Sequence, residues 1–291
     1  MKASIGFVGV GWMGTGMARH LLAAGHPVTV HAHRNRSGVD RLRALGAAEA
    51  GDLASLARAA EVIVLSLSDA EAVRAVLDDA GPGLRPGHLV IDATTSDPRV
   101  TRALAGSLSA RGVRLVDAPV TGGPTQAEAG VLGSLVGCDA PDFDAVKQIV
   151  SCYSTVVQRM GGVGSGHAAK LLNNFVTQGT VALVAEAYTR ARDQGIDWHA
   201  LYAVMCAGAA RSGTLEKVVG PALGGDFDGS KFTIRNAAKD LGYYCALAAD
   251  SDRGRSALGE AIHRRFADAE ASGVGHRFVS RLLDPHFPGP D

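Results

Sequence analysis

Residues 164–195 read GSGHAAKLLNNFVTQGTVALVAEAYTRARDQG, and this stretch decides how the rest of the chain is divided. It opens with small residues, contains no proline and closes on Gly195 after a polar last turn. It therefore predicts a single helix, about 40–45 Å long at 1.5 Å per residue. From Ala168 to Ala185 the sequence has one ionisable residue, Lys170. A helix that is apolar all round is buried all round, so we expect a lysine inside a buried helix.

Polar residues gather next to this lysine. Asn173 and Asn174 follow Lys170 at i+3 and i+4, and Thr177 and Gln178 come one turn later. Such a cluster argues against a membrane span. A lone lysine near a helix start often extends its ammonium group to solvent. Within a polar cluster on an apolar helix, a functional lysine is the stronger interpretation.

Bulk composition limits the classes of protein to consider. The chain has 291 residues, enough for two domains, and its 29 basic and 29 acidic residues balance. This balance gives no electrostatic case for nucleic-acid or membrane partners. Four scattered cysteines follow no metal or disulfide spacing, so we expect reduced thiols and no metal. The opening MKASIGFVGVG enters a strand pattern directly, so we expect no signal peptide and a soluble, cytoplasmic protein.

The first apolar run, Ser4–Val10, leads into a glycine-rich loop and then a helical pattern. The loop has the spacing GxGxxG, in which glycines permit a tight turn, close approach of a pyrophosphate and helix–strand packing. A glycine-rich turn without a ligand is the alternative, but this strand–loop–helix context predicts dinucleotide binding. The expected cofactor residues here are Gly9, Gly11, Trp12, Met13 and Gly14.

The next predicted strand, Pro27–His33, should end at the residue that contacts the adenosine ribose. A carboxylate there would bind the 2′-hydroxyl of NAD, but none occurs before Asp40. Arg34 and Arg36 follow the strand instead, and arginine suits a phosphate, so NADP is favoured with NAD possible. The alternative is a solvated basic loop.

The alternation of strands and helices continues. Val62–Leu67 and His88–Thr94 predict buried parallel strands, and helices follow at Asp69–Asp79 and Pro98–Arg111. Asp97 is the expected N-cap of the second helix, with Pro98 at its first position. Because strand carboxyl ends line the ligand crevice of such a sheet, we expect further cofactor contacts there. The residues concerned are Leu67, Ser68, Thr94 and Thr95, and the hydroxyl residues among them could also cap helices, which is compatible with cofactor contact.

Another predicted strand, Arg114–Val120, breaks into the turn Thr121-Gly122-Gly123-Pro124. Such a turn can present consecutive backbone N–H groups and a hydroxyl to an anion, or it can be an ordinary tight turn. Val131–Cys138 and Ser154–Met160 predict two more strands around a helix at Asp142–Cys152. After Gly195 only helical patterns remain, at Trp198–Ala210, Thr214–Val219, Phe232–Ala249, Arg255–Ser272 and Arg277–Leu283.

These patterns together predict an α/β fold in two parts. Residues 1–162 should form a Rossmann-type, doubly wound dinucleotide-binding domain. Residues 163–291 should form an all-helical domain for substrate binding and dimerisation, with 163–195 as the interdomain helix. Because that helix is so apolar, we expect a homodimer or homotetramer built through the second domain.

Four motifs in register resemble the β-hydroxyacid dehydrogenase family, which contains 3-hydroxyisobutyrate dehydrogenase and tartronate semialdehyde reductase. They are the cofactor loop at 6–14, Asp117–Gly123, Gly164–Asn174, and Phe232 with Lys239-Asp240. The sequence departs from the family at Thr121, where serine is usual, and at Cys138, where glycine is usual. The Arg34/Arg36 loop aligns only with a one-residue ambiguity.

The resemblance implies an NAD(P)-dependent oxidoreductase of the EC 1.1.1 type, acting on a small β-hydroxy acid or its semialdehyde. It implies that the substrate carboxylate binds at Thr121, Gly122 and Gly123. Lys170 would be the general acid/base, since burial lowers the pKa of an ammonium group toward neutral pH. Asn174 would hold substrate and lysine in register.

The C-terminal motif supplies two further candidate residues, and two other functions are compatible with the same architecture. Lys239 would lie against the cofactor with Asp240 supporting it, or the two would form a solvated pair. One rival is an imine reductase of the same architecture, and the other is a catalytically inactive NADP-binding scaffold. Relatives of both kinds lack the lysine that Lys170 matches. Decarboxylating 6-phosphogluconate dehydrogenase is related but considerably longer.

Overall fold

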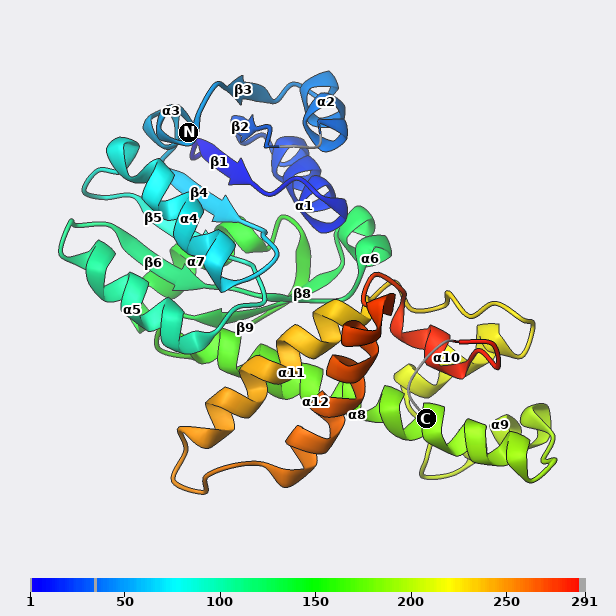
Figure 1. Cartoon of the computed structure of the whole chain (residues 1–291). Coiled ribbons are helices and arrows are strands. Elements are labelled where there is room, and N and C mark those ends of the chain that lie inside the picture. Colours follow the sequence, from blue (N-terminus) through cyan, green and yellow to red (C-terminus); the bar gives the residue numbers. More distant parts are fainter. Residues whose placement is uncertain (1, 34–35, 288–291) are drawn as a thin grey trace. The chain divides into compact units, whose positions relative to one another are not determined.

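The computed structural model describes residues 2–33 and 36–287 and divides into two compact units, residues 1–170 and 171–291 (Figure 1). Arg34 therefore lies outside the described residues. Within the described ranges, every helix is too short or too polar to serve as a transmembrane span.

A nine-stranded sheet forms the centre of the first unit in the described part of the chain, in the order β3-β2-β1-β4-β5-β6-β8-β7, with β9 paired to β8. The parallel strands are β1 (Ile5–Val8), β2 (Val28–His31), β3 (Ala48–Ala50), β4 (Val62–Leu65), β5 (Leu89–Asp92) and β6 (Arg114–Asp117). The chain builds outward from β1 in one direction and from β4 in the other. This reversal between β1 and β4 is the switch point of a doubly wound sheet, as predicted.

Beyond β6 the sheet contains both parallel and antiparallel strand pairs. β8 (Leu132–Gly137) pairs antiparallel with β6 and with β7 (Val120–Thr121), and parallel with β9 (Ser154–Gly161). The prediction of one strand over Arg114–Val120 is therefore wrong: β6 ends at Asp117 and β7 is a separate, antiparallel strand. Pro119 lies at the break, where its missing N–H cannot contribute to a strand ladder.

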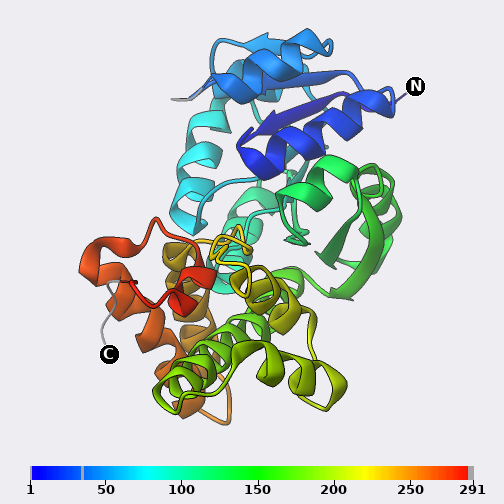
Figure 2. The same cartoon turned by 90° about the vertical axis from the view of Figure 1, so that its right-hand side faces the viewer.

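Helices cover both faces of this sheet (Figures 1 and 2). They are α1 (Trp12–Ala23), α2 (Ser37–Ala44), α3 (Leu53–Ala59), α4 (Ala70–Ala80), α5 (Pro98–Ser109), α6 (Pro124–Ala129) and α7 (Phe143–Val150), with single 3-10 turns at Gly81–Gly83 and Ala140–Asp142. Ile5 and Phe7 pack into one apolar core and Val8 into the other, as the two-residue period of a strand requires. Each fully buried aliphatic side chain contributes roughly 1.5–3 kcal/mol, so this alternation fixes the strand register.

The predicted start of α5 is confirmed. The Asp97 side chain accepts a hydrogen bond from the backbone N–H of Arg99 at 2.8 Å, and Pro98 is the first helical residue. Asp97 thus replaces one of the hydrogen bonds that the helix start lacks.

α8 (Ser165–Asp193) is one uninterrupted helix of 29 residues that begins in the first unit and continues into the second. The second unit adds α9 (Trp198–Ala207), α10 (Gly213–Ala222), α11 (Ile234–Ala249) and α12 (Ala257–Ala269), followed by a π-helical turn at Glu270–Val274 and a 3-10 helix at Val279–Leu283. Its core collects Val181 and Tyr188 of α8 with Leu241 and Phe266 of α11 and α12.

The expectation that α8 is buried on every side is wrong for the single chain. Leu172, Val176 and Leu183 are each more than half exposed and recur at helical spacing along one face of the helix. α9 is apolar in composition but contains no buried residue. The second unit therefore leaves apolar helix surface uncovered.

Candidate active site

A cavity of about 730 Å³ opens at the carboxyl ends of β1 and β4. The loop between β1 and α1 forms one wall through Gly9 and Gly11, and Leu67 and Ser68 after β4 form another. The cavity therefore lies at the switch point of the sheet, where open α/β folds bind their ligands.

The three glycines of the loop have three different surroundings. A Cβ on Gly9, whose φ is +96°, would lie 2.1 Å from the Ser66 carbonyl oxygen. A Cβ on Gly14 would lie 1.9 Å from the Gly9 carbonyl oxygen. A Cβ on Gly11 would meet nothing within 4 Å. Gly9 and Gly14 are thus required by the fold, whereas Gly11 keeps open the space in front of the helix.

That space faces the amino end of α1. Gly11 is the N-cap and supplies no side-chain hydrogen bond, and the first turn contains no acidic residue. The first N–H groups of a helix have no partner within the helix and carry partial positive charge. Trp12, which lines the cavity, and Met13 begin this turn. An open, uncapped helix start of this kind fits a pyrophosphate.

At the other end of the cavity, the basic residues are arranged differently from the prediction. Arg36 is exposed and bonded to Glu49 at 2.9 and 3.1 Å and to Asp40 at 3.2 Å. These carboxylates raise the pKa of the Arg36 guanidinium. The cavity is instead lined by Arg41, and by His31, His33 and Ser37. Sequence reasoning missed Arg41 because it lies inside α2, beyond the loop that follows the strand.

Of the hydroxyl residues at the strand ends, Ser68 lines the cavity directly. Thr94 is buried, and its hydroxyl accepts a hydrogen bond from the backbone N–H of Leu67 at 3.0 Å. Thr94 therefore holds the loop that contains Leu67 and Ser68. Thr95, half-buried, follows Thr94 after β5.

The predicted anion turn forms the link between β7 and α6. Gly122 has a φ of +107°, a conformation that glycine adopts without strain. The N–H of Gly123 donates to Oε1 of Gln126 at 3.0 Å, so one backbone donor of this turn is already engaged. The Thr121 hydroxyl lies 3.5 Å from the Gly133 carbonyl oxygen, the long limit for a hydrogen bond.

Lys170 lies in the second turn of α8 and is 8% exposed, as the sequence predicted for a buried lysine. The start of this helix is fixed by Asp117 of β6, which accepts hydrogen bonds from the N–H groups of Gly164 and His167 at 2.6 and 2.7 Å. Sequence reasoning missed both Asp117 and His167 as supports of this helix.

In the second unit, Asn174 and Asp240 are almost fully buried, and Nδ2 of Asn174 donates to Oδ2 of Asp240 at 2.6 Å. Because a carboxylate can only accept, it sets the Asn174 amide with its NH₂ group toward Asp240. Oδ1 of Asp240 lies 3.2 Å from the Lys239 ammonium, so Asp240 contacts both Lys239 and Asn174.

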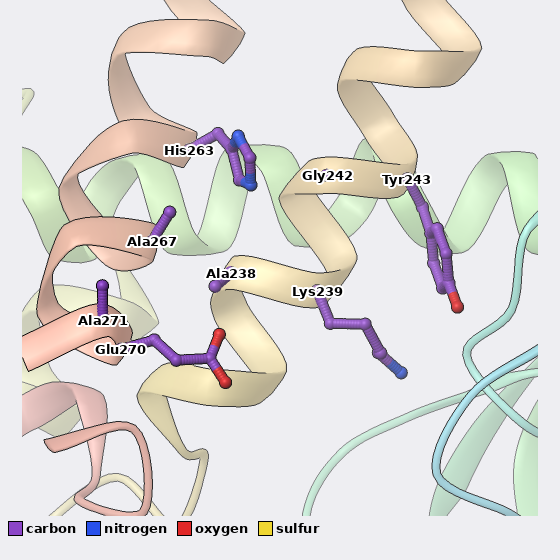
Figure 3. Close-up of a pocket in the computed structure, with 8 residues that line it drawn as sticks. All are labelled: Ala238, Lys239, Gly242, Tyr243, His263, Ala267, Glu270 and Ala271. Atoms are coloured by element: carbon purple, nitrogen blue, oxygen red, sulfur yellow. The ribbon is translucent and has the colours of Figure 1, made fainter. Parts of the chain in front are cut away.

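Lys239 extends from α11 to the side away from α12, together with Tyr243 (Figure 3). Its ammonium group lies 5.7 Å from the centroid of the Tyr243 ring. A shallow cavity of about 500 Å³ between α11 and α12 is floored by small residues, and its Glu270 is paired with Arg235 at 3.0 Å. Among residues 2–33 and 36–287, no group of three or more His, Cys, Asp or Glu side chains could hold a metal ion.

Comparison with known proteins agrees with this arrangement. Residues 4–162 match the NAD-binding domain of 6-phosphogluconate dehydrogenase, and residues 164–285 match the NAD-binding domain of NADP-dependent 3-hydroxyisobutyrate dehydrogenase. The chain therefore belongs to the β-hydroxyacid dehydrogenase family, whose members are NAD(P)-binding oxidoreductases.

Individual relatives cover nearly the whole chain. Mitochondrial 3-hydroxyisobutyrate dehydrogenase of Drosophila melanogaster is 30% identical over 97% of this chain and 88% of its own length. L-threonate dehydrogenase of Cupriavidus necator is 30% identical over 99% of this chain and 97% of its own. Among solved structures, 3-hydroxyisobutyrate dehydrogenase of Mycobacterium tuberculosis, described with L-serine, is 25% identical with a TM-score of 0.87, covering 97% of this chain and 98% of that one.

Proposed function

We propose that this protein transfers a hydride between NADP(H) and a small β-hydroxy acid or its semialdehyde, with Lys170 as general acid/base. One observation carries the proposal. A buried lysine lies at the start of α8, in the same unit as a switch-point cavity with an open, uncapped helix start.

The bound nicotinamide would supply or accept the hydride, and this chain's residues would bind, orient and handle protons. The amino end of α1 and the loop Gly9–Gly14 would hold the pyrophosphate. Lys170 would take the proton from the substrate hydroxyl in oxidation and return it in reduction. Asn174, its amide set by Asp240, would bind the substrate, and Lys239 would contact the cofactor.

For the substrate carboxylate we propose Thr121, Gly122 and Gly123. The names of two relatives support a hydroxy acid, since 3-hydroxyisobutyrate and L-threonate both carry a carboxylate and a hydroxyl. Oε1 of Gln126 accepts the hydrogen bond from the Gly123 N–H. A bound carboxylate would therefore replace the Gln126 side chain at this donor.

For cofactor choice we propose NADP(H) over NAD(H), with Arg41 supplying a charged contact to the 2′-phosphate. Arg41 lines the cavity and has a longer ion pair with Glu128 at 3.7 Å, whereas Arg36 is held by Glu49 at 2.9 Å and by Asp40 at 3.2 Å. A cytoplasmic location remains an expectation from the sequence.

We also propose that the chain self-associates through its second unit, as a homodimer or homotetramer. The support is the uncovered apolar face of α8 at Leu172, Val176 and Leu183, together with α9, where Val204 is 70% exposed. Large exposed apolar surface marks interaction sites in soluble proteins.

To test this proposal, a panel of small β-hydroxy acids and semialdehydes is assayed with NADP(H) and with NAD(H). Cyclic imines and ketone–amine mixtures are assayed in parallel as substrates of the rival activity. We expect turnover of at least one hydroxy acid or semialdehyde, with NADP(H) preferred. Turnover of imines alone would identify an imine reductase. Tight NADPH binding without any turnover would identify a scaffold, and either result would overturn the proposal.

A further inference from the structure

The first turn of α8 is held by a carboxylate from the middle of the sheet. Asp117, at the end of β6, is fully buried and bonds through Oδ1 to the N–H of Gly164 and through Oδ2 to the N–H of His167. Both donors belong to the helix start, whose N–H groups have no partner within the helix. Asp117 thus acts as a cap that is supplied from another element.

Two glycines make this close fit possible. A Cβ on Gly137 of β8 would lie 2.4 and 2.6 Å from the two oxygens of Asp117. A Cβ on Gly166 of α8 would lie 2.3 Å from the Leu135 carbonyl oxygen and 2.9 Å from the Gly137 nitrogen. The helix therefore starts in direct contact with β8, at one permitted depth.

The His167 side chain adds two more attachments. Its ring is fully buried, with Nε2 at 2.8 Å from the Thr94 carbonyl oxygen and Nδ1 at 2.8 Å from the Thr101 hydroxyl of α5. A carbonyl oxygen only accepts, so Nε2 carries a proton. Thr94 is also the residue whose hydroxyl holds Leu67 at the cavity wall.

The same ring lies among buried carboxylates. Asp92 and Asp117 each approach one ring nitrogen to 3.9 Å. Burial raises the pKa of Asp92, and the neighbouring His167 opposes that rise. A network of satisfied polar groups in a low-dielectric interior is rigid, and it is costly to leave one member unpaired.

We propose that His167 is a positioning residue for Lys170, which follows it by three residues on the same helix. By bonding to Thr94 and Thr101, His167 fixes the rotation and depth of the first turn of α8 relative to the strand ends at the cavity. The lysine is thereby held where its proton transfer is effective. This inference rests on the proposed role of Lys170 as acid/base. A misplacement of about 1 Å in a catalytic group can cost about 100-fold in rate.

The test compares His167→Leu, which removes both hydrogen bonds, with His167→Gln, which keeps one donor and one acceptor. His88 provides the matched control, because it is also a buried histidine of the first unit, at the opposite end of β5 from Thr94. We would measure four quantities for each variant: kcat, KM, the Kd of NADPH and the free energy of unfolding in urea. All measurements are made at a temperature well below the melting temperature of the variant.

We expect His167→Leu to lower kcat about 10- to 100-fold while the Kd of NADPH stays near wild type. His167→Gln should recover much of that loss, and His88→Leu should lower the unfolding free energy without lowering kcat. If kcat of folded His167→Leu equals wild type, if His167→Gln is no better than His167→Leu, or if His88→Leu lowers kcat equally, the proposal is overturned.

Should His167→Leu fail to fold, Thr101→Val decides, because it leaves the His167 ring in place and removes the hydroxyl at Nδ1, which also donates to the Asp97 carbonyl oxygen at 3.1 Å. We expect a lower kcat with unchanged NADPH affinity, and an unchanged kcat would overturn the proposal. Lys170→Ala distinguishes a failure of the proposed function from a failure of the positioning role of His167. An active Lys170→Ala enzyme would refute the proposed function itself, whereas an inactive one beside a fully active His167→Leu would refute only the positioning role.

Discussion

Replacing Gly11 by alanine should separate cofactor binding from folding. Gly11 has φ −75° and ψ −158°, which any residue can adopt, and a Cβ there would meet no atom within 4 Å. A glycine-to-alanine change at a compatible position leaves stability unchanged or raises it by up to about 1 kcal/mol. The free energy of unfolding without cofactor should therefore not fall.

The effect on binding should be large, because the new methyl group would lie in front of the uncapped amino end of α1. The bound pyrophosphate would lose close contact with at least one N–H group. A hydrogen bond to a charged group is worth about 1.5–3 kcal/mol, so the Kd of NADPH should rise about 10- to 150-fold.

The assay is a fluorescence titration with NADPH beside urea unfolding of the unliganded protein. Gly14→Ala is the control, because its Cβ would lie 1.9 Å from the Gly9 carbonyl oxygen and would force the backbone to move. That variant should lose about 1–3 kcal/mol of stability, as overpacked sites do. Wild-type NADPH affinity in Gly11→Ala would refute the assignment of this loop to the cofactor.

Three further predictions concern charge and assembly. Arg41→Ala should raise the KM for NADPH at least about 10-fold and leave the KM for NADH nearly unchanged, and equal changes for both cofactors would contradict a 2′-phosphate contact. Burial raises the pKa of the Asp97 carboxyl group, but its interactions with Arg99 outweigh burial, and the pKa in the folded protein is lowered. The ionised Asp97 therefore stabilises the fold above its unfolded pKa of about 3.9. This contribution disappears as the pH falls through the lower pKa of the folded protein. The difference in unfolding free energy between wild type and Asp97→Asn should therefore be largest near about pH 6 and shrink below about pH 4, and a constant difference would contradict the depressed pKa. Light scattering should show that the wild-type protein is an oligomer and that Val204→Glu disrupts it. The control Val156→Glu, at an exposed valine of β9, should leave the oligomer intact. A monomeric wild-type protein would contradict the proposed assembly.

The strands and helix caps of the first unit could be predicted because their signals are local. β1, β4 and β5 are continuous apolar runs, and Asp97-Pro98 combines a capping carboxylate with a proline suited to the first helical position. α2, α3, α6 and β3 were not predicted, because three to eight residues give too short a window for periodicity.

The residues of the candidate site could likewise be predicted only where the signal in the sequence is local. Lys170 and Asn174 could be recognised because they lie one turn apart on one helix. The bond between Asn174 and Asp240 joins residues 66 positions apart, and that between Asp117 and His167 joins residues 50 apart. No local pattern encodes such pairs. Arg36 was predicted as a phosphate contact because the sequence did not show that Glu49 would be close enough to bind it.

Replacing Lys170 by arginine is the sharpest test of its proposed role as general acid/base. Arginine keeps the positive charge but cannot give up its proton near neutral pH. Positioned proton transfer contributes about 10²- to 10⁴-fold, so turnover of Lys170→Arg should fall by at least about 100-fold. NADPH affinity, measured in parallel, should remain near wild type, because the pyrophosphate contacts proposed for Gly9–Gly14 do not involve Lys170. Near-wild-type turnover in Lys170→Arg would show that another group transfers the proton.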